Sequence, residues 1–230
     1  MRSDESTAQP TTGKARPVRV WDLPTRAFHW LVVALVVAAY ATWRLNWMDW
    51  HVRIGEAVLA LVLFRILWGC FGSDTARFRS FVAAPGAALR HLRHAWRREA
   101  DRQVGHNPAG GWMVLALLAL LLGETLSGLY VNNDVADEGP FTDWVPAAVA
   151  NAITALHEIL WDLLLAAVVL HLLAIAGYAA VKGHDLLRPM LTGRKLLPAT
   201  VPAPRLAPVW RALGLLAVSA AAAWGLATWL

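Results

Sequence analysis

Two histidines on one apolar segment are the residues of this sequence whose type and spacing most directly indicate chemistry. His157 and His171 lie within ITALHEILWDLLLAAVVLHLLAIAGY (residues 153–178), and the thirteen residues between them are almost all apolar. Fourteen helical steps return the chain to within about 40° of the same face and advance it by about 21 Å. We therefore expect the two imidazoles on one stripe of a single helix, at two different depths.

The composition of the chain places this helix in a membrane. Of its 230 residues, 57% are hydrophobic and 16% are charged, and the mean hydropathy is +0.45. A hydrocarbon core about 30 Å thick needs roughly 20 apolar helical residues to cross it. Five segments are long enough, and many of the thirteen tryptophans lie near segment ends. The predicted fold is an all-α membrane protein with helices at 28–48, 52–71, 112–131, 154–179 and 209–230.

The basic residues predict the orientation of these helices. Lys and Arg gather before the first segment, between the second and third, and after the fourth, whereas the connection from the third to the fourth has none and is acidic. The positive-inside rule then puts the N-terminus in the cytoplasm and the C-terminus outside, which in a bacterial cytoplasmic (inner) membrane is the periplasm. Juxtamembrane arginines facing anionic lipid account for the sequence pI of about 10.0. We therefore expect membrane lipid, and no nucleic acid, as a partner.

Two further histidines complete two pairs at matched depths in this topology. His29 lies near the inner start of the first helix, and His51 at the outer start of the second. His29 and His171 then form the inner pair, and His51 and His157 the outer pair. Neutral imidazoles on facing helices are the axial ligands of a haem. The single cysteine, Cys70, excludes the C-x-x-C-H attachment of a c-type haem, so the predicted cofactor is non-covalent haem b, two per chain.

Haem-free chemistry is the alternative for these histidines. Zinc usually takes four ligands in a tetrahedron. Glu56, Glu158 and Asp162 are available near the outer pair, but no membrane carboxylate is available near the inner pair. A metal or proton transporter would be expected to have helices interrupted by Gly or Pro. The segment between His157 and His171 is uninterrupted, which favours the haem interpretation.

Several stretches resemble the bacterial cytochrome b561 family, which includes the b-type cytochrome subunits of nickel-iron hydrogenases. They are WDLPTRAFHW, HVRIGEAVLALVLFRILWG, GHNPAGGWMVL, LHEILWDLLLAAVVLHLLAIAGY and KGHDLLRPMLTGRK, within residues 18–196. The resemblance implies a four-helix bundle that holds two b haems. It also implies bis-histidine ligation by His29 with His171 and by His51 with His157.

The same resemblance implies a respiratory-chain role, in which electrons pass between the quinone pool and a redox partner at the membrane surface. A periplasmic c-type cytochrome or a hydrogenase subunit is the expected kind of partner, and the acidic stretch at 132–143 is a candidate docking site. The family also includes free-standing quinone reductases and superoxide oxidases. The sequence does not decide whether this chain is an enzyme or a subunit that only carries electrons.

Charged residues inside the helices give two further hypotheses. Arg65 lies fourteen residues after His51, near the inner level, and is a candidate partner of an inner haem propionate, with Arg26 or Lys182 beside it. Its alternative is snorkelling to lipid headgroups. Glu124 or Asp162 is a candidate lining residue of an outer quinol pocket, because quinol oxidation releases protons. The alternative for Glu124 is a hydrogen bond to a neighbouring helix.

The remaining segments have simpler interpretations. Residues 1–17 are predicted to be a disordered cytoplasmic tail, residues 18–196 the di-haem domain, residues 197–208 a stiff Pro-rich linker, and residues 209–230 an additional helix appended to the four-helix unit. Residues 87–100 predict an amphipathic helix on the inner surface, with His91 and His94 on its polar face. His106 and His184 stand at inner helix ends and are not predicted to be ligands.

Overall fold

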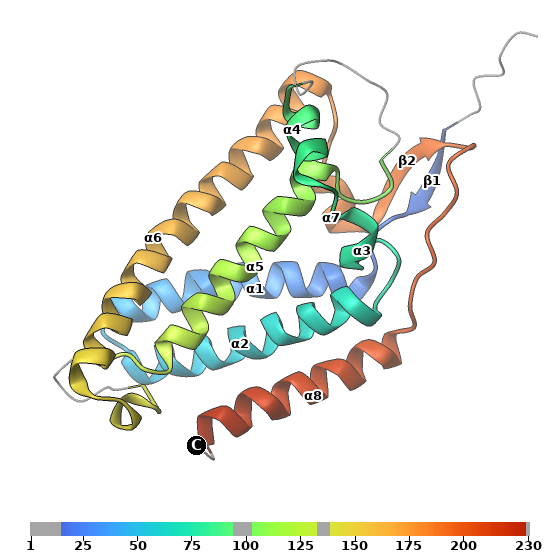
Figure 1. Ribbon diagram of the computed structural model, residues 1–230. Helices are drawn as coiled ribbons and strands as arrows, with labels where there is room; N and C mark the ends of the chain where they lie inside the picture. Colours follow the sequence, from blue (N-terminus) through green and yellow to red (C-terminus); the bar gives the residue numbers. More distant parts are fainter. Residues whose placement is uncertain (1–14, 94–102, 133–138, 229–230) are drawn as a thin grey trace, which may run out of the picture.

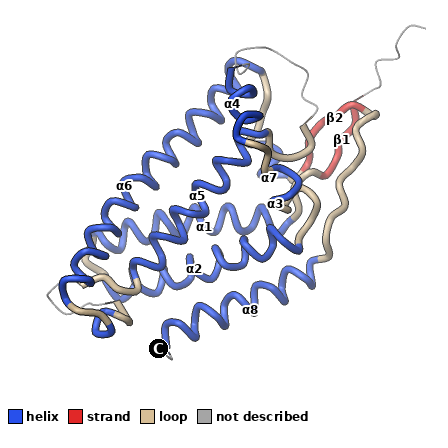
Figure 2. The backbone as a smooth tube through the Cα atoms, viewed as in Figure 1, coloured by secondary structure: helices blue, strands red, loops and turns tan. Residues whose placement is uncertain are grey.

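The structure is a computed structural model that describes residues 15–93, 103–132 and 139–228. Five long helices dominate it, and each is long and apolar enough to cross a membrane, which confirms the five predicted segments (Figures 1 and 2). They are α1 (Leu23–Arg44), α2 (Met48–Phe71), α5 (Pro108–Gly128), α6 (Ala147–Gly177) and α8 (Val209–Thr228). The shorter elements are β1 (Ala15–Arg19), α3 (Phe78–Phe81), α4 (Pro85–Arg93), the 3₁₀ turn η1 (Thr142–Trp144), the π-helical turn η2 (Tyr178–Lys182), α7 (Leu187–Thr192) and β2 (Arg194–Pro198).

The long helices alternate in direction, and α2 is the central one. It packs against α1, α5 and α8, whereas α6 packs mainly against α5, as Figure 1 shows. The starts of α1, α5 and α8 and the ends of α2 and α6 lie together at the end of the bundle that carries the basic connections, which we call the basic end. The opposite end, with the acidic third connection, is called the acidic end.

Two polar N-caps fix where helices begin at the basic end. The side chain of Asp22 accepts a hydrogen bond from the backbone N–H of Thr25 at 2.7 Å, and Asn107 accepts one from Gly110 at 2.7 Å. A proline follows in the first turn of each helix, where its missing N–H costs no hydrogen bond. The other oxygen of Asp22 accepts the indole N–H of Trp68 at 3.1 Å. The start of α1 is thereby tied to the end of α2.

A small antiparallel sheet at the basic end departs from the all-α expectation. Strands β1 and β2 pair from Ala15 with Pro198 to Arg19 with Arg194. Residues 15–17, expected in the tail, and residues 197–198, expected in the linker, therefore belong to this sheet; residues 1–14 lie outside the described part of the chain. A buried apolar cluster below the sheet supplies the reason for the pairing, and its members are Val18, Val20, Trp21 and Leu197.

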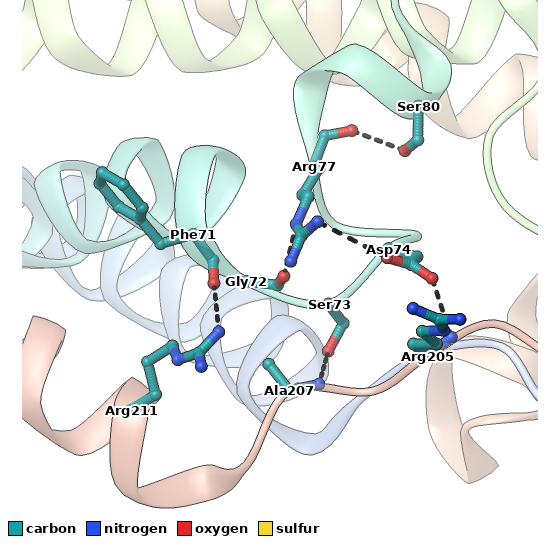
Figure 3. A network of polar contacts seen from close by, with 9 residues as sticks. All are labelled: Phe71, Gly72, Ser73, Asp74, Arg77, Ser80, Arg205, Ala207 and Arg211. Carbon is teal, nitrogen blue, oxygen red and sulfur yellow. Dashed lines mark hydrogen bonds and ion pairs between the residues drawn. The ribbon is translucent and has the colours of Figure 1, made fainter.

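Helix α8 packs along α2 and is more than a loose appendage. Ser219 and Ala223 on its inner face are buried. The segment before α8 is held by the turn after α2 (Figure 3): the N–H of Ala207 donates to Ser73 Oγ at 2.8 Å, and the N–H of Arg205 donates to Asp74 Oδ2 at 3.0 Å. The Arg211 guanidinium also donates to the carbonyl of Phe71 at 3.2 Å (Figure 3). The Pro-rich connection is thus fixed where it meets the bundle.

The predicted surface helix is shorter in the structure than in the sequence interpretation. Helix α4 ends at Arg93, and residues 94–102, including His94, lie outside the described ranges. Helix α4 packs against α5, and the indole N–H of Trp112 donates to the carbonyl of Ala83 at 3.1 Å. His91 Nε2 lies 2.6 Å from the hydroxyl of Tyr178. His91 therefore bonds the end of α6, a contact that its predicted place on the polar face of this helix did not indicate.

Candidate functional site

The outer pair comes together at the acidic end, with His51 supplied by the second turn of α2 and His157 by α6. The two imidazoles are close enough to interact electrostatically. Both side chains are half-buried, and each is anchored through Nδ1 to a different helix.

His51 is anchored to α1. Its Nδ1 lies 2.9 Å from the carbonyl oxygen of Ala39. Because a carbonyl only accepts hydrogen bonds, Nδ1 must carry the hydrogen, and Nε2 keeps its lone pair. The structure therefore fixes the tautomer that a metal-binding imidazole needs.

His157 is anchored to α5 in the same way. Its Nδ1 lies 2.9 Å from Ser127 Oγ, and the same hydroxyl lies 3.0 Å from the carbonyl of Glu124, to which it can donate its single hydrogen. When it does so, Nδ1 is the donor to Ser127 and the neutral ring carries its lone pair on Nε2. A Cβ at Gly128 would lie 3.3 Å from His157 Cε1, so the end of α5 is shaped closely around this ring.

Helices α1 and α6 otherwise make little direct contact, but an aromatic pair bridges them near the outer pair. The rings of Tyr40 and Trp161 stack with centroids 5.4 Å apart and planes 10° from parallel. Tyr40 follows Ala39, and Trp161 lies one helical turn after His157. Sequence reasoning did not assign these two residues or Ser127 to the site, because no motif or periodicity marks a contact between helices.

Glu124 is the acidic side chain that the structure places against the outer pair. Its Oε1 lies 3.4 Å from His157 Nε2, and its buried Oε2 has no hydrogen-bond partner in the described part of the chain. Asp162 and Glu158 are exposed on α6, and Glu56 is half-buried. Of the two candidates named from the sequence, Glu124 is half-buried beside His157, whereas Asp162 is exposed.

The inner pair comes together toward the basic end, with His29 on α1 and His171 on α6. The two imidazoles interact electrostatically. The Nδ1 atom of His29 is buried without a hydrogen-bond partner among the described residues, and its ring meets Trp30 edge-on at 4.8 Å. A buried imidazole nitrogen without a partner is costly, so this site fits a group that would supply one.

An apolar layer separates the two pairs. Leu164, seven residues from each histidine of α6, is buried in a cluster with Val32, Val58, Val62 and Leu121. These side chains come from all four helices α1, α2, α5 and α6. The two polar sites are therefore distinct, with an apolar layer between them.

Arg65 points into the bundle near its basic end. Its side chain is only 3% exposed, so the alternative in which it snorkels to lipid headgroups is wrong. The guanidinium lies over the ring of Phe78 at 5.3 Å, and its buried Nη1 has no partner among the described residues. The two expected companions have other contacts: Arg26 donates to the carbonyl of Leu191, and Lys182 lies over the ring of Tyr178.

His106 is the residue near the inner pair that sequence reasoning left out. Its ring lies between Trp21 and Phe81, with centroid separations of 4.7 and 4.8 Å. Its Nδ1 is buried without a partner in the described part of the chain. Burial, reinforced by the charge of Arg65, lowers the pKa of the His106 imidazole to about 3, so the ring is neutral. His184, by contrast, stays at the end of η2, where its backbone N–H donates to the carbonyl of Tyr178.

Within residues 15–93, 103–132 and 139–228, no group of three or more His, Cys, Asp or Glu side chains is placed to hold a metal ion. The histidines are instead arranged as two pairs, and in the outer pair each imidazole is held through Nδ1. This arrangement fits a cofactor that brings its own equatorial ligands and needs two axial imidazoles.

Residues 20–193 match the family model described as prokaryotic cytochrome b561. Comparisons with curated proteins and with solved structures give no match. The matched span begins directly after β1 and ends directly before β2, so it contains all four histidines, Arg65 and His106 but not α8. With its five apolar helices, the chain therefore belongs to the prokaryotic cytochrome b561 family of multi-pass membrane proteins, which bind b-type haem and transfer electrons.

Proposed function

We propose that the protein binds two b haems, one between His29 and His171 and one between His51 and His157, and conducts electrons across the membrane between them. The observation that carries this proposal is the anchoring of both outer imidazoles through Nδ1, that of His51 by the Ala39 carbonyl and that of His157 by the Ser127 hydroxyl. A ligating histidine almost always donates its other N–H in this way. The inner pair is supported by the proximity of His29 to His171; the Nδ1 of His29 has no partner among the described residues, so the hydrogen bond that holds each outer imidazole has no counterpart there.

The haem supplies the one-electron redox chemistry, and the protein supplies ligands, spacing and surroundings. The Ala39 carbonyl and the Ser127 hydroxyl hold the outer imidazoles in one orientation. The layer around Leu164 keeps water from the space between the two levels. The fourteen-residue spacing on α6 sets the levels about 21 Å apart along the helix axis.

The electron donor and acceptor in this proposal are the quinone pool and a redox partner at the membrane surface of a respiratory chain. The basic connections favour an orientation with the basic end in the cytoplasm of a bacterial inner membrane. The inner pair would then lie on the cytoplasmic side. The acidic third connection would face the periplasm, where a basic c-type cytochrome or a hydrogenase subunit would dock.

Glu124 supports a quinol site near the outer pair. Its side chain is half-buried beside His157, and its buried Oε2 is without a partner among the described residues. Because quinol oxidation releases protons together with electrons, a buried carboxylate at this position is suited to accept one. Ligation through His157 Nε2 requires Glu124 to give up its present contact with that atom, which would free the carboxyl group for a substrate.

Spectroscopy of the purified full-length protein tests the proposal. We expect a reduced α-band typical of haem b and two extractable haems per chain. Single changes to Ala at His29, His51, His157 and His171 should each remove one haem, with the members of a pair giving the same residual spectrum. Protein without haem refutes the proposal, and residual spectra that group the histidines differently refute the assigned pairs.

A further inference from the structure

Two buried side-chain nitrogens at the basic end lack partners among the described residues and lie close enough for their groups to interact electrostatically. They are Nη1 of Arg65, on the last turns of α2, and Nδ1 of His106, in the connection before α5. The charge of Arg65 acts on the His106 imidazole, and so do those of His29 and His171. Arg65 and the inner pair therefore all lie within electrostatic range of His106.

The charge of Arg65 is not balanced by a contact with an acid. Within the described ranges, no carboxylate forms an ion pair with it. Asp22 is the acidic group whose charge reaches the guanidinium. Both oxygens of Asp22 are engaged elsewhere, one by the N–H of Thr25 and the other by the indole of Trp68. A buried cation without a bonded anion is strongly unfavourable, so the geometry calls for an anionic group at this position.

The His106 ring is held rigidly. Trp21 and Phe81 lie on either side of it, and both are fixed through their backbones. The N–H groups of Val20 and Trp21 donate to the carbonyl of Gly193. Only glycine fits at position 193, because its φ of +77° is left-handed and a Cβ there would lie 2.8 Å from the carbonyl oxygen of Trp21.

The segment that carries Phe81 is fixed against two helices. A Cβ at Gly111 would come within 2.6 Å of the Phe81 carbonyl, so this segment runs directly over the start of α5. On the other side, the ring of Phe78 occupies the space that a Cβ at Gly69 of α2 would need. The same ring lies below the Arg65 guanidinium. The donors of Arg65 and His106 are thus preorganised on rigid supports.

We infer that Arg65 and His106 together form a binding site for a carboxylate, namely a propionate of the haem held by His29 and His171. A guanidinium and a neutral imidazole N–H are both good donors to a carboxylate. This assignment rests on the proposed function and adds His106 to it as a positioning residue. It also explains why a neutral histidine is held against two tilted aromatic rings at a helix start.

Charge determines the direction in which Arg65 and His106 should shift the midpoint potential of the haem. Positive charge and hydrogen-bond donors beside a propionate reduce the negative potential at the iron, which favours the ferrous state. Removing either donor should therefore lower the midpoint potential of one haem and leave that of the other unchanged.

A redox titration of purified holoprotein, followed by the α-bands, tests the inference. His106→Asn and His106→Gln form the decisive comparison, because the Asn amide can take the place of Nδ1 whereas the Gln amide reaches the position of Nε2. We expect His106→Gln and Arg65→Gln to lower the potential of one haem, and His106→Asn to keep it near the wild-type value. The double variant Arg65→Gln/His106→Gln should show a smaller fall than the sum of the two single falls, because both donors act on one group.

Arg211→Gln is the matched control, since it also removes a guanidinium at the basic end but one that bonds the Phe71 carbonyl. It should leave both potentials unchanged. Repeating the His106 comparison in a His157→Ala background, which retains only the inner haem, should preserve the difference. Equal potentials in the Asn and Gln variants, or a fall in the outer haem, overturn the inference while two haems per chain leave the proposed function standing. A chain without haem refutes the proposed function itself.

Discussion

His157 and Ser127 form a 2.9 Å hydrogen bond that joins α6 to α5 at the acidic end. The Ser127 hydroxyl also lies within hydrogen-bond distance of the Glu124 carbonyl, so it can donate there and accept from His157 Nδ1. A metal-binding histidine is usually oriented by a hydrogen bond from its other ring nitrogen, and Ser127 is placed to accept such a bond from His157.

Replacing Ser127 by Ala should weaken haem binding at the outer site by about 10–100-fold, the usual cost of losing a hydrogen bond behind a ligating histidine. The measurement is the rate at which haem passes from the protein to an excess of a haem-accepting apoprotein, followed spectroscopically. Thr125→Ala is the control, because the Thr125 hydroxyl bonds only carbonyls of its own helix. Equal rates in the two variants would contradict the role of Ser127.

Inserting one alanine after Leu165 should remove one haem. The insertion rotates one imidazole of α6 relative to the other by about 100° and moves it by about 1.5 Å. Haem extraction should then give one haem per chain rather than two. An alanine inserted after Thr200, in the connection before α8, is the control and should leave the haem content unchanged. Two haems in the helix variant would show that the fourteen-residue spacing is not required.

Glu124→Gln should slow electron transfer from a quinol by about 100-fold or more, the usual contribution of a positioned general base. Haem content should stay at the wild-type level. The measurement is the rate of haem reduction after rapid mixing with a water-soluble quinol. Asp162→Asn is the control, because that side chain is exposed. A normal rate in Glu124→Gln would remove Glu124 from the quinol site, and a slow rate in Asp162→Asn would transfer the role.

Ser73→Ala should destabilise the attachment of α8 by about 1–3 kcal/mol, because the N–H of Ala207 loses its buried acceptor. Limited proteolysis should then cut the connection at residues 199–208 sooner, while the haem spectrum stays unchanged. Ser80→Ala is the control, since its exposed hydroxyl bonds the carbonyl of Arg77 (Figure 3). Cleavage at the wild-type rate would show that α8 is held by its packing on α2 alone.

The spans and the matched depths of the histidines could be predicted because both depend on counting along a helix. Apolar length predicts a membrane span, and fourteen residues predict a shared face, so the sequence alone brings His157 to the level of His51. That each pair ligates a haem stays a prediction. The groups that bond Nδ1 of the histidines could not be predicted. The partner of His51, for example, is the backbone carbonyl of Ala39, and every residue type has such a carbonyl.

Contacts between distant segments account for most of what the sequence left open. The pairing of residues 15–19 with 194–198 joins one strand that precedes four membrane helices in the sequence to another that follows them. No local sequence pattern encodes such a pairing. Arg65 fitted both a buried and a lipid-facing position, because periodicity gives a face of α2 but not the helix that covers it. His106 was not predicted to be a ligand because it has no histidine partner at its depth. Its two aromatic neighbours, and the nearby buried Arg65 guanidinium, become apparent only in the three-dimensional structure.

The sheet of β1 and β2 bears on the order of events during synthesis. It joins the residues before α1 to those after α6, the two helices that carry the inner pair. The ribosome must therefore have synthesised the chain as far as Pro198 before β1 and β2 can pair and join these helices at the basic end. The outer pair is complete once His157 has been inserted. We expect the outer cofactor to load first, and the inner one to be enclosed only when the last strand closes.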